Sequence, residues 1–129
     1  MKLSFIIIDD RELDCFIAEK FIQKTGVSIG NKIFHDAISG LDYIKNNTVA
    51  DAAVTVVLLD IMMPVMNGFE FIEEFEKLPE EIISNYRIVP ITTSLNKNDI
   101  EKISGYKSVI SVLKKPFTFD ELVAALQTI

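Results

Sequence analysis

Short apolar runs alternate along the chain with longer stretches in which apolar residues recur every three or four positions. A short, unbroken apolar run rich in β-branched residues is typical of a strand buried on both faces, whereas the three-and-four spacing is typical of an amphipathic helix. The sequence therefore predicts strands at residues 3–8, 54–59, 87–92 and 109–113, with a weaker one at 32–34.

The periodic stretches between and after these runs predict five helices. Each helix is expected to present an apolar face to the rest of the protein. The apolar positions are Leu13, Phe16, Ile17 and Phe21 in the first, Ile38, Leu41 and Ile44 in the second, Phe71, Ile72, Phe75 and Leu78 in the third, Ile100 and Ile103 in the fourth, and Leu122, Ala125, Leu126 and Ile129 in the fifth.

Local signals mark where several of these helices begin. The segments NGFE at 67–70 and TFDE at 118–121 match the capping-box pattern, in which a polar side chain and a glutamate three residues later bond each other's backbone. Asn96 or Asn98 would cap the fourth helix. The two capping boxes place the starts of the third and fifth helices, and Asn96 or Asn98 places the start of the fourth.

Strands that alternate with helices form a parallel sheet, because parallel neighbours need crossover connections and those connections are right-handed. The pattern predicts a three-layer, doubly wound α/β domain with a five-stranded parallel sheet. Pro90 falls within the fourth strand and can donate no ladder hydrogen bond, so we expect that strand to be short or bulged there.

Length and composition narrow the classes of protein. A chain of 129 residues fits one domain, residues 1–129, and the net charge of -6 with scattered lysines argues against direct nucleic-acid binding. No apolar run approaches the roughly 20 residues of a membrane helix, and residues 1–8 resemble a strand more than a signal peptide. Cys15 is the single cysteine, which excludes an internal disulfide and points to a reducing cytoplasm.

Polar residues stand at the ends of four predicted strands. In a parallel sheet those ends meet at one edge, where α/β proteins bind ligands. Carboxylates brought together there repel one another unless a cation joins them, and Mg²⁺ prefers such oxygen ligands together with phosphate. A lysine and a hydroxyl complement phosphoryl oxygens, so the set indicates a metal-assisted phosphoryl site with an aspartate nucleophile. The residues are Asp9 and Asp10, Asp60, Thr92, Thr93 and Ser94, and Lys114 and Lys115.

Four segments in this order, IIIDD, LLDIMMPVMNG, ITTS and KKPF, carry a family resemblance. Over essentially its whole length the chain resembles the receiver domain of two-component response regulators, in particular stand-alone receivers like the chemotaxis regulator. The resemblance implies a flavodoxin-like sheet of order 2-1-3-4-5. It also implies that Asp60 accepts a phosphoryl group from a phosphohistidine on a sensor kinase or phosphotransfer protein.

The resemblance further implies a metal site for Mg²⁺, with Mn²⁺ as an alternative. Asp10 and Asp60 would bind the ion directly, Asp9 would act mainly through a bound water, and the backbone carbonyl of Met62 would complete the protein ligands. Without Asp60 and the other strand ends, Asp9 and Asp10 would be read as a simple helix cap.

Two further site residues follow from the same resemblance. Lys115, directly before the proline of KKPF, would pair with the phosphoryl group, in preference to Lys114. Thr92 would move to hydrogen-bond it, with Thr93 as the competing hydroxyl. The family often has an aromatic residue three positions before the lysine, whose ring turns inward when the threonine moves. Here that position is Val112, so the chain has no ring there to make this movement.

The resemblance implies a signalling phosphoacceptor and not an enzyme. Phosphorylation would reshape the surface built by the fourth strand, the fourth helix and the fifth strand, including residues 104–112, for a downstream protein partner. We expect a cytoplasmic monomer or a phosphorylation-dependent dimer, without an output domain and without direct contact to nucleic acid or membrane.

Two alternatives share the acidic cluster. A Mg²⁺-dependent phosphohydrolase with an aspartyl-phosphate commonly needs a second aspartate two residues after the first, where this chain has Met62. An interaction module with a relict site would not need all the acid, hydroxyl and lysine positions to be filled. Outside the cluster we expect Cys15 to be partly buried, His35 to have no metal or triad role, and Glu80 and Glu81 to lie on a solvated face or in a loop.

Overall fold

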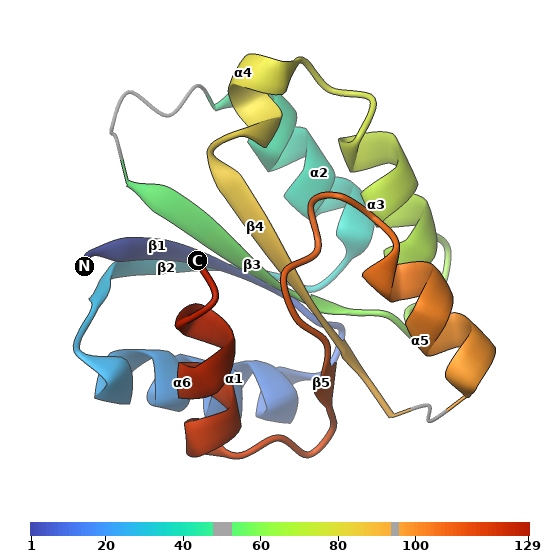
Figure 1. Cartoon of the computed structure of the whole chain (residues 1–129). Coiled ribbons are helices and arrows are strands. Elements are labelled where there is room, and N and C mark those ends of the chain that lie inside the picture. The colour runs from blue at the N-terminus through green and yellow to red at the C-terminus, as the bar shows by residue number, and fades with distance from the viewer. Residues whose placement is uncertain (48–52, 94–95) are drawn as a thin grey trace.

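A computed structural model describes residues 1–47, 53–93 and 96–129, and Ser94 lies outside these ranges. Its elements follow the order β1(Leu3–Ile8), α1(Glu12–Thr25), β2(Ser28–Phe34), α2(Ala37–Asn46), β3(Val54–Asp60), α3(Gly68–Phe75), α4(Glu80–Ile83), β4(Tyr86–Thr92), α5(Lys97–Ser104), β5(Leu113–Lys114) and α6(Phe119–Leu126). The strands form a parallel sheet in the order β2-β1-β3-β4-β5 (Figure 1), so the predicted fold class and strand order are confirmed.

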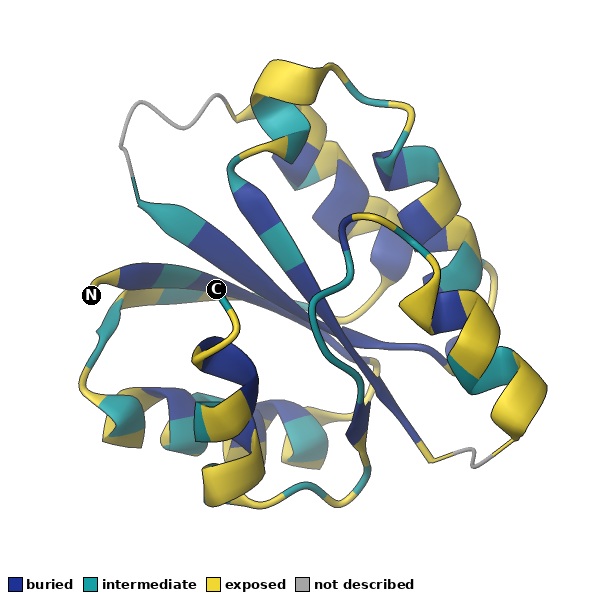
Figure 2. Cartoon of the chain, viewed as in Figure 1, coloured by how far each residue is buried: buried dark blue, intermediate teal, exposed yellow. Residues whose placement is uncertain are grey.

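Helices cover both faces of the sheet and enclose two apolar clusters. On one face α2, α3 and α5 pack over Ile6, Ile8 and the strand residues in register with them. On the other face α1 and α6 pack over Phe5 and Ile7. Successive side chains of a strand point to opposite faces, which is why β1 and β3, covered on both faces, are mostly apolar and buried along most of their length (Figure 2).

The β4–β5 edge departs from the sequence-based prediction. β4 runs from Tyr86 to Thr92 with no break in its register to β3, so the expected shortening or bulge at Pro90 is wrong. The Ile88 N–H donates to the carbonyl of residue 108, the Ile88 carbonyl accepts from the N–H of residue 110, and the Thr92 carbonyl accepts from the Lys115 N–H. The backbone groups of residues 88 and 92 thus face β5. Pro90 lies between them at the same spacing, so its nitrogen, which carries no hydrogen, also faces β5. The pairing is interrupted in the neighbouring strand instead, because β5 has only two residues and an isolated bridge at Val109.

Helix starts were predicted well and one helix was not predicted. Both capping boxes are present, at Asn67 and Thr118, and Asn96 is the residue that caps α5. Glu80 and Glu81, expected on a solvated face or in a loop, are exposed and begin the short helix α4. None of the helices in the described ranges is both long and apolar enough to cross a membrane.

The first helix buries only part of the apolar face predicted for it. Leu13 and Phe16 are 68% and 56% exposed, whereas Cys15, Ala18 and Ile22 pack against the sheet. Cys15, expected to be partly buried, is buried. Of the other two predicted apolar positions, Ile17 is also exposed and Phe21 is partly buried against the same cluster, so the predicted face is buried only at Phe21.

Candidate functional site

Four sequence-distant segments meet at the carboxyl edge of the sheet. Asp60 is the last residue of β3, Asp9 directly follows β1, and Thr92 is the last residue of β4. The Lys115 N–H donates to the Thr92 carbonyl at 2.9 Å, which fixes the lysine beside β4. Parallel pairing therefore gathers the residues that the strand-end pattern singled out.

Lys115 is the centre of an ionic cluster. Its Nζ lies 2.7 Å from Asp9 Oδ2, 3.0 Å from Asp14 Oδ2 and 3.6 Å from Asp60 Oδ2. The lysine side chain is 15% exposed and those of Asp9 and Asp60 are each 6% exposed. Burial favours the neutral amine, but the hydrogen bonds to Asp9 and Asp14 outweigh it and raise the pKa of Lys115.

Asp14 was not among the residues singled out in the sequence. It lies in the first turn of α1 and reaches the site from a helix, not from a strand end. Its place in the first turn of the helix that follows Asp9 and Asp10 is the signal that could have found it, because that turn begins beside the end of β1.

The backbone of Asp9 is held by a second, neutral set of contacts. Its carbonyl accepts from the Cys15 thiol at 3.4 Å and lies 3.2 Å from His35 Nδ1, which can donate to it as the Nδ1–H tautomer. One carboxylate oxygen accepts from the Arg11 N–H at 3.0 Å. Burial, and then the neighbouring carboxylates of Asp9 and Asp14, raise the pKa of the Cys15 thiol to about 11, so this cysteine stays a packed thiol. His35 thus contacts the site through the backbone of Asp9.

The carboxylate of Asp60 is in an unfavourable electrostatic position. Burial, followed by the negative charge of Asp9, raises its pKa to about 6, although Lys115 and the Met62 N–H oppose the shift. That N–H donates to Asp60 Oδ1 at 3.2 Å. A carboxylate that is ionised near neutral pH but poorly stabilised is well suited to react as a nucleophile or to gain from a nearby cation.

The donor set fits a hard divalent cation. Asp9, Asp10 and Asp60 each offer a carboxylate oxygen, and these oxygens lie within 4.8 Å of one another. Asp9 and Asp60 are buried whereas Asp10 is exposed, so a bound ion would keep access to water. All-oxygen ligation with room for water is what Mg²⁺ requires. Met62, the fourth predicted ligand, is exposed in the loop after β3.

A cavity of about 250 Å³ opens beside the cluster, between α1 and the segment that follows β5. Asp9, Asp14, Thr93 and Lys115 contribute polar groups to its wall. Thr92 is 3% exposed, whereas Thr93 is exposed. The two hydroxyl candidates thus stand at different depths next to the same ionic cluster.

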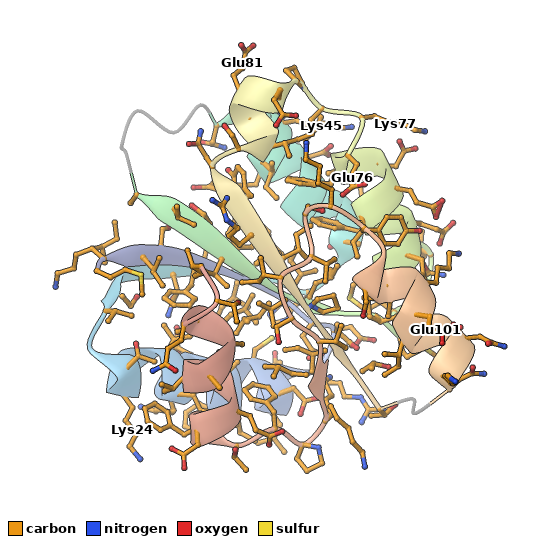
Figure 3. The ribbon with its side chains drawn as sticks, in the orientation of Figure 1. Lys24, Lys45, Glu76, Lys77, Glu81 and Glu101 are labelled. Atoms are coloured by element: carbon orange, nitrogen blue, oxygen red, sulfur yellow. The ribbon has the colours of Figure 1, made fainter. Side chains whose placement is uncertain are left out.

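The loop from Gly105 to Val112, which joins α5 to β5, lies over the apolar cluster formed with α3. Tyr106, Val109 and Val112 are partly buried against that cluster. The buried Ser108 is tied to α3 through Glu76, whose Oε2 accepts from the Ser108 N–H at 2.9 Å and from its hydroxyl at 2.7 Å. Figure 3 shows Glu76 directed toward this loop, while Lys77, Glu81 and Glu101 point outward.

A model of the response regulator receiver domain matches residues 5–127 of the chain. The chain belongs to the response regulator receiver family. Receiver domains serve phosphorylation-dependent signalling in two-component systems, and they are phosphoacceptors and not classical enzymes. Members of the family bind Mg²⁺ at an acidic pocket, and this receiver has an acidic cluster of the matching kind.

Similar proteins place the receiver in different contexts. The sensor histidine kinase CheAY of Helicobacter pylori is 25% identical over 123 residues, which are 95% of this chain and 14% of that protein. The transcriptional regulatory protein CpxR of Escherichia coli K12 is 25% identical over 130 residues, which are 100% of this chain and 49% of that protein. The chain thus spans less than half of each of these relatives.

Solved structures resemble the receiver over nearly its full length. A response regulator receiver protein from Dyadobacter fermentans is 34% identical with a TM-score of 0.85, covering 97% of this chain and 95% of that one. A two-component response regulator from Cytophaga hutchinsonii has a TM-score of 0.87, covering 98% of this chain and 96% of that one, at 21% identity. The second likeness concerns the fold alone.

Proposed function

We propose that this receiver is a phosphorylation switch in which Asp60 accepts a phosphoryl group from a phosphohistidine of a sensor histidine kinase or histidine phosphotransfer protein. The observation that carries the proposal is the position of Asp60: a buried carboxylate with a pKa near 6, 3.6 Å from a lysine ammonium and grouped with Asp9 and Asp10. At neutral pH most of the Asp60 side chains are ionised and available to attack phosphorus.

In the proposed transfer, a carboxylate oxygen of Asp60 forms a bond to phosphorus. The bond between phosphorus and the donor imidazole nitrogen breaks, and its electron pair stays on that nitrogen, which takes up a proton. The product is an acyl phosphate on Asp60. Lys115 would neutralise part of the charge on the phosphoryl oxygens, and the Thr92 hydroxyl would donate a hydrogen bond to one of them.

Mg²⁺, with Mn²⁺ as an alternative, would offset the negative charge of the carboxylates and the phosphoryl group. The ligands would be Asp10 and Asp60, Asp9 through a water, and the Met62 carbonyl. Asp9 is bonded to Lys115 and to the Arg11 N–H, which suits an indirect role, whereas the exposed Asp10 has no such partner in the described part of the chain.

The phosphoryl group would change the conformation of the β4–α5–β5 surface, where a downstream protein would bind. Phosphorylation adds about -1.5 to -2 charges, and it shifts a conformational equilibrium only as far as the phosphoryl contacts differ between the two conformations. Thr92 ends β4 and pairs with Lys114, two residues after the Gly105–Val112 loop, and that loop is attached to β4 by few backbone hydrogen bonds, at Ile88. Since Val112 carries no ring, we propose that movement of this loop as a unit transmits the change.

Intact mass after incubation with Mg²⁺ and acetyl phosphate or phosphoramidate tests the proposal. We expect one phosphoryl adduct in wild type, none in Asp60→Asn, and none when EDTA removes the metal. Asp42→Asn, a loss of an exposed carboxylate on α2, is the matched control and should form the adduct normally. Rapid turnover of many phosphate esters would favour the phosphohydrolase, and no adduct under any condition would favour the relict module.

The choice between the two hydroxyls has its own test. Thr92→Val and Thr93→Val each remove one hydroxyl with little change in volume. If Thr92 contacts the phosphoryl group, only the first substitution should lower the affinity for beryllofluoride, a phosphoryl mimic. A loss confined to Thr93→Val would assign the role to the threonine that lines the cavity.

A further inference from the structure

Two carboxylates bind the Lys115 ammonium more closely than Asp60 does, and one of them, Asp14, lies outside the four segments that carry the family resemblance. An ammonium has three donors. Two of them reach carboxylate oxygens at hydrogen-bond distance, 2.7 Å to Asp9 and 3.0 Å to Asp14. The 3.6 Å separation from Asp60 Oδ2 is an ion pair without a hydrogen bond.

The three carboxylates around Lys115 differ in how much free energy it would cost to break their contact with the lysine. Asp9 and Asp60 are buried at strand ends, and under the proposed function both also serve the metal. Asp14 sits on the first turn of α1, 31% exposed, and belongs to no other part of the cluster. Water can solvate the Asp14 carboxylate once the lysine leaves it, so this is the contact that can be exchanged at the least cost.

We propose that Asp14 is a positioning residue that holds Lys115 in the resting receiver and competes with the phosphoryl group for the lysine. This inference rests on the proposed function, because it presupposes a phosphoryl group on Asp60. The competition sets how tightly the receiver binds the phosphoryl group: a stronger Asp14–Lys115 pair favours the resting state. Asp14 would thus tune the fraction of phosphorylated protein at a given donor concentration without touching the reacting atoms.

A titration with beryllofluoride in the presence of Mg²⁺, followed by ¹⁹F NMR, measures this competition in the full chain. Asp14→Asn should bind beryllofluoride about fivefold more tightly than wild type, the size expected for loss of one partly exposed ion pair. Asp14→Glu keeps the carboxylate, so its affinity for beryllofluoride should stay within about twofold of that of wild type.

Glu12→Gln is the matched control, because Glu12 is an exposed acid in the same first turn and does not contact Lys115. It should leave the affinity unchanged. An equal gain in Glu12→Gln would mean a general charge effect, and unchanged or weaker binding in Asp14→Asn would overturn the proposal. A gain of the same factor in a Lys115→Ala background would show direct repulsion by Asp14 and would also overturn it. Failure of wild type itself to bind beryllofluoride would instead reject the proposed function.

Discussion

The carboxyl edge of the sheet and the Gly105–Val112 loop are held by different kinds of interaction. At the edge, buried carboxylates surround one ammonium, and burial together with Asp9 raises the pKa of Asp60 to about 6. The loop is attached to the rest of the protein by partly buried apolar side chains and by the hydrogen bonds between Glu76 and Ser108. Under the proposed function, the edge would be stabilised by a cation or a phosphoryl group, and the loop, which has few strand hydrogen bonds, would move. A switch needs both properties.

Rigid packing next to Asp60 predicts the largest effect. A methyl group added at Gly68 would meet the Ile61 backbone, 2.7 Å from its Cα, whereas one added at Gly105 would make ordinary 3.5 Å contacts. Gly68→Ala should lower the free energy of unfolding by about 1–3 kcal/mol. Gly105→Ala should leave it unchanged or raise it by about 0.5 kcal/mol. Urea titration checks both, and equal effects would remove the contrast between the two regions.

The electrostatic cost at the edge should appear as a dependence of stability on pH. Because the folded-state pKa of Asp60 lies above its ordinary value of 3.8, the folded state binds the proton more tightly, and ionisation of Asp60 lowers stability as pH rises from about 4 to about 6. In EDTA at pH 7.5, Asp60→Asn should therefore be more stable than wild type by about 1–2 kcal/mol, a gain that shrinks toward pH 4.

Thermal unfolding of the two proteins across this pH range measures the effect. Asp42→Asn, on the exposed side of α2, should change stability by no more than about 0.5 kcal/mol at any pH. A less stable Asp60→Asn at pH 7.5 would mean that the ion pair with Lys115 outweighs burial.

The attachment of the loop predicts a smaller effect. Ser108→Ala removes the hydroxyl bond to Glu76 and leaves the backbone N–H bond in place, so we expect a loss of about 1 kcal/mol. Ser104→Ala, at the exposed end of α5, is the control and should be neutral. Amide hydrogen exchange should quicken over 105–112 in Ser108→Ala; unchanged exchange would mean that apolar contacts alone hold the loop.

The smallest expected effect concerns the loop after Asp60. Val65 has φ 69°, a left-handed conformation that β-branched residues rarely adopt, and its side chain is 88% exposed. Val65→Gly should raise the free energy of unfolding by about 0.5 kcal/mol, since relief of strain exceeds the added flexibility of the unfolded chain. Chemical denaturation of the two proteins measures it, and a loss of stability would show that Val65 packs usefully.

Sequence patterns predicted those features that depend on short-range chemistry or on the parallel order of the strands. The capping boxes at Asn67 and Thr118 formed as expected because a cap involves only four neighbouring residues. Asp9, Asp60 and Lys115 came together because parallel strands bring their carboxyl ends to one edge. The roles assigned to these residues stay predictions.

The remaining features depend on contacts distant in sequence. The buried stripe of α1 is Cys15, Ala18 and Ile22, and of the predicted apolar residues only Phe21 packs beside it, because contacts with the sheet decide which side of the helix is buried. Pro90 interrupted its neighbour β5 and not its own strand, because the direction of its missing N–H is set by register. Asp14 was missed because no strand-end pattern includes the first turn of a helix.

Chemical location of the phosphoryl group tests the central proposal most directly. Wild-type protein treated with Mg²⁺ and acetyl phosphate is reduced with borohydride, which converts an aspartyl phosphate to homoserine, and then digested and sequenced by mass spectrometry. We predict homoserine at position 60, and unmodified aspartate at Asp9, Asp10 and Asp14. Homoserine at any of those three positions, or none at position 60, would contradict the assignment of Asp60 as the phosphoacceptor.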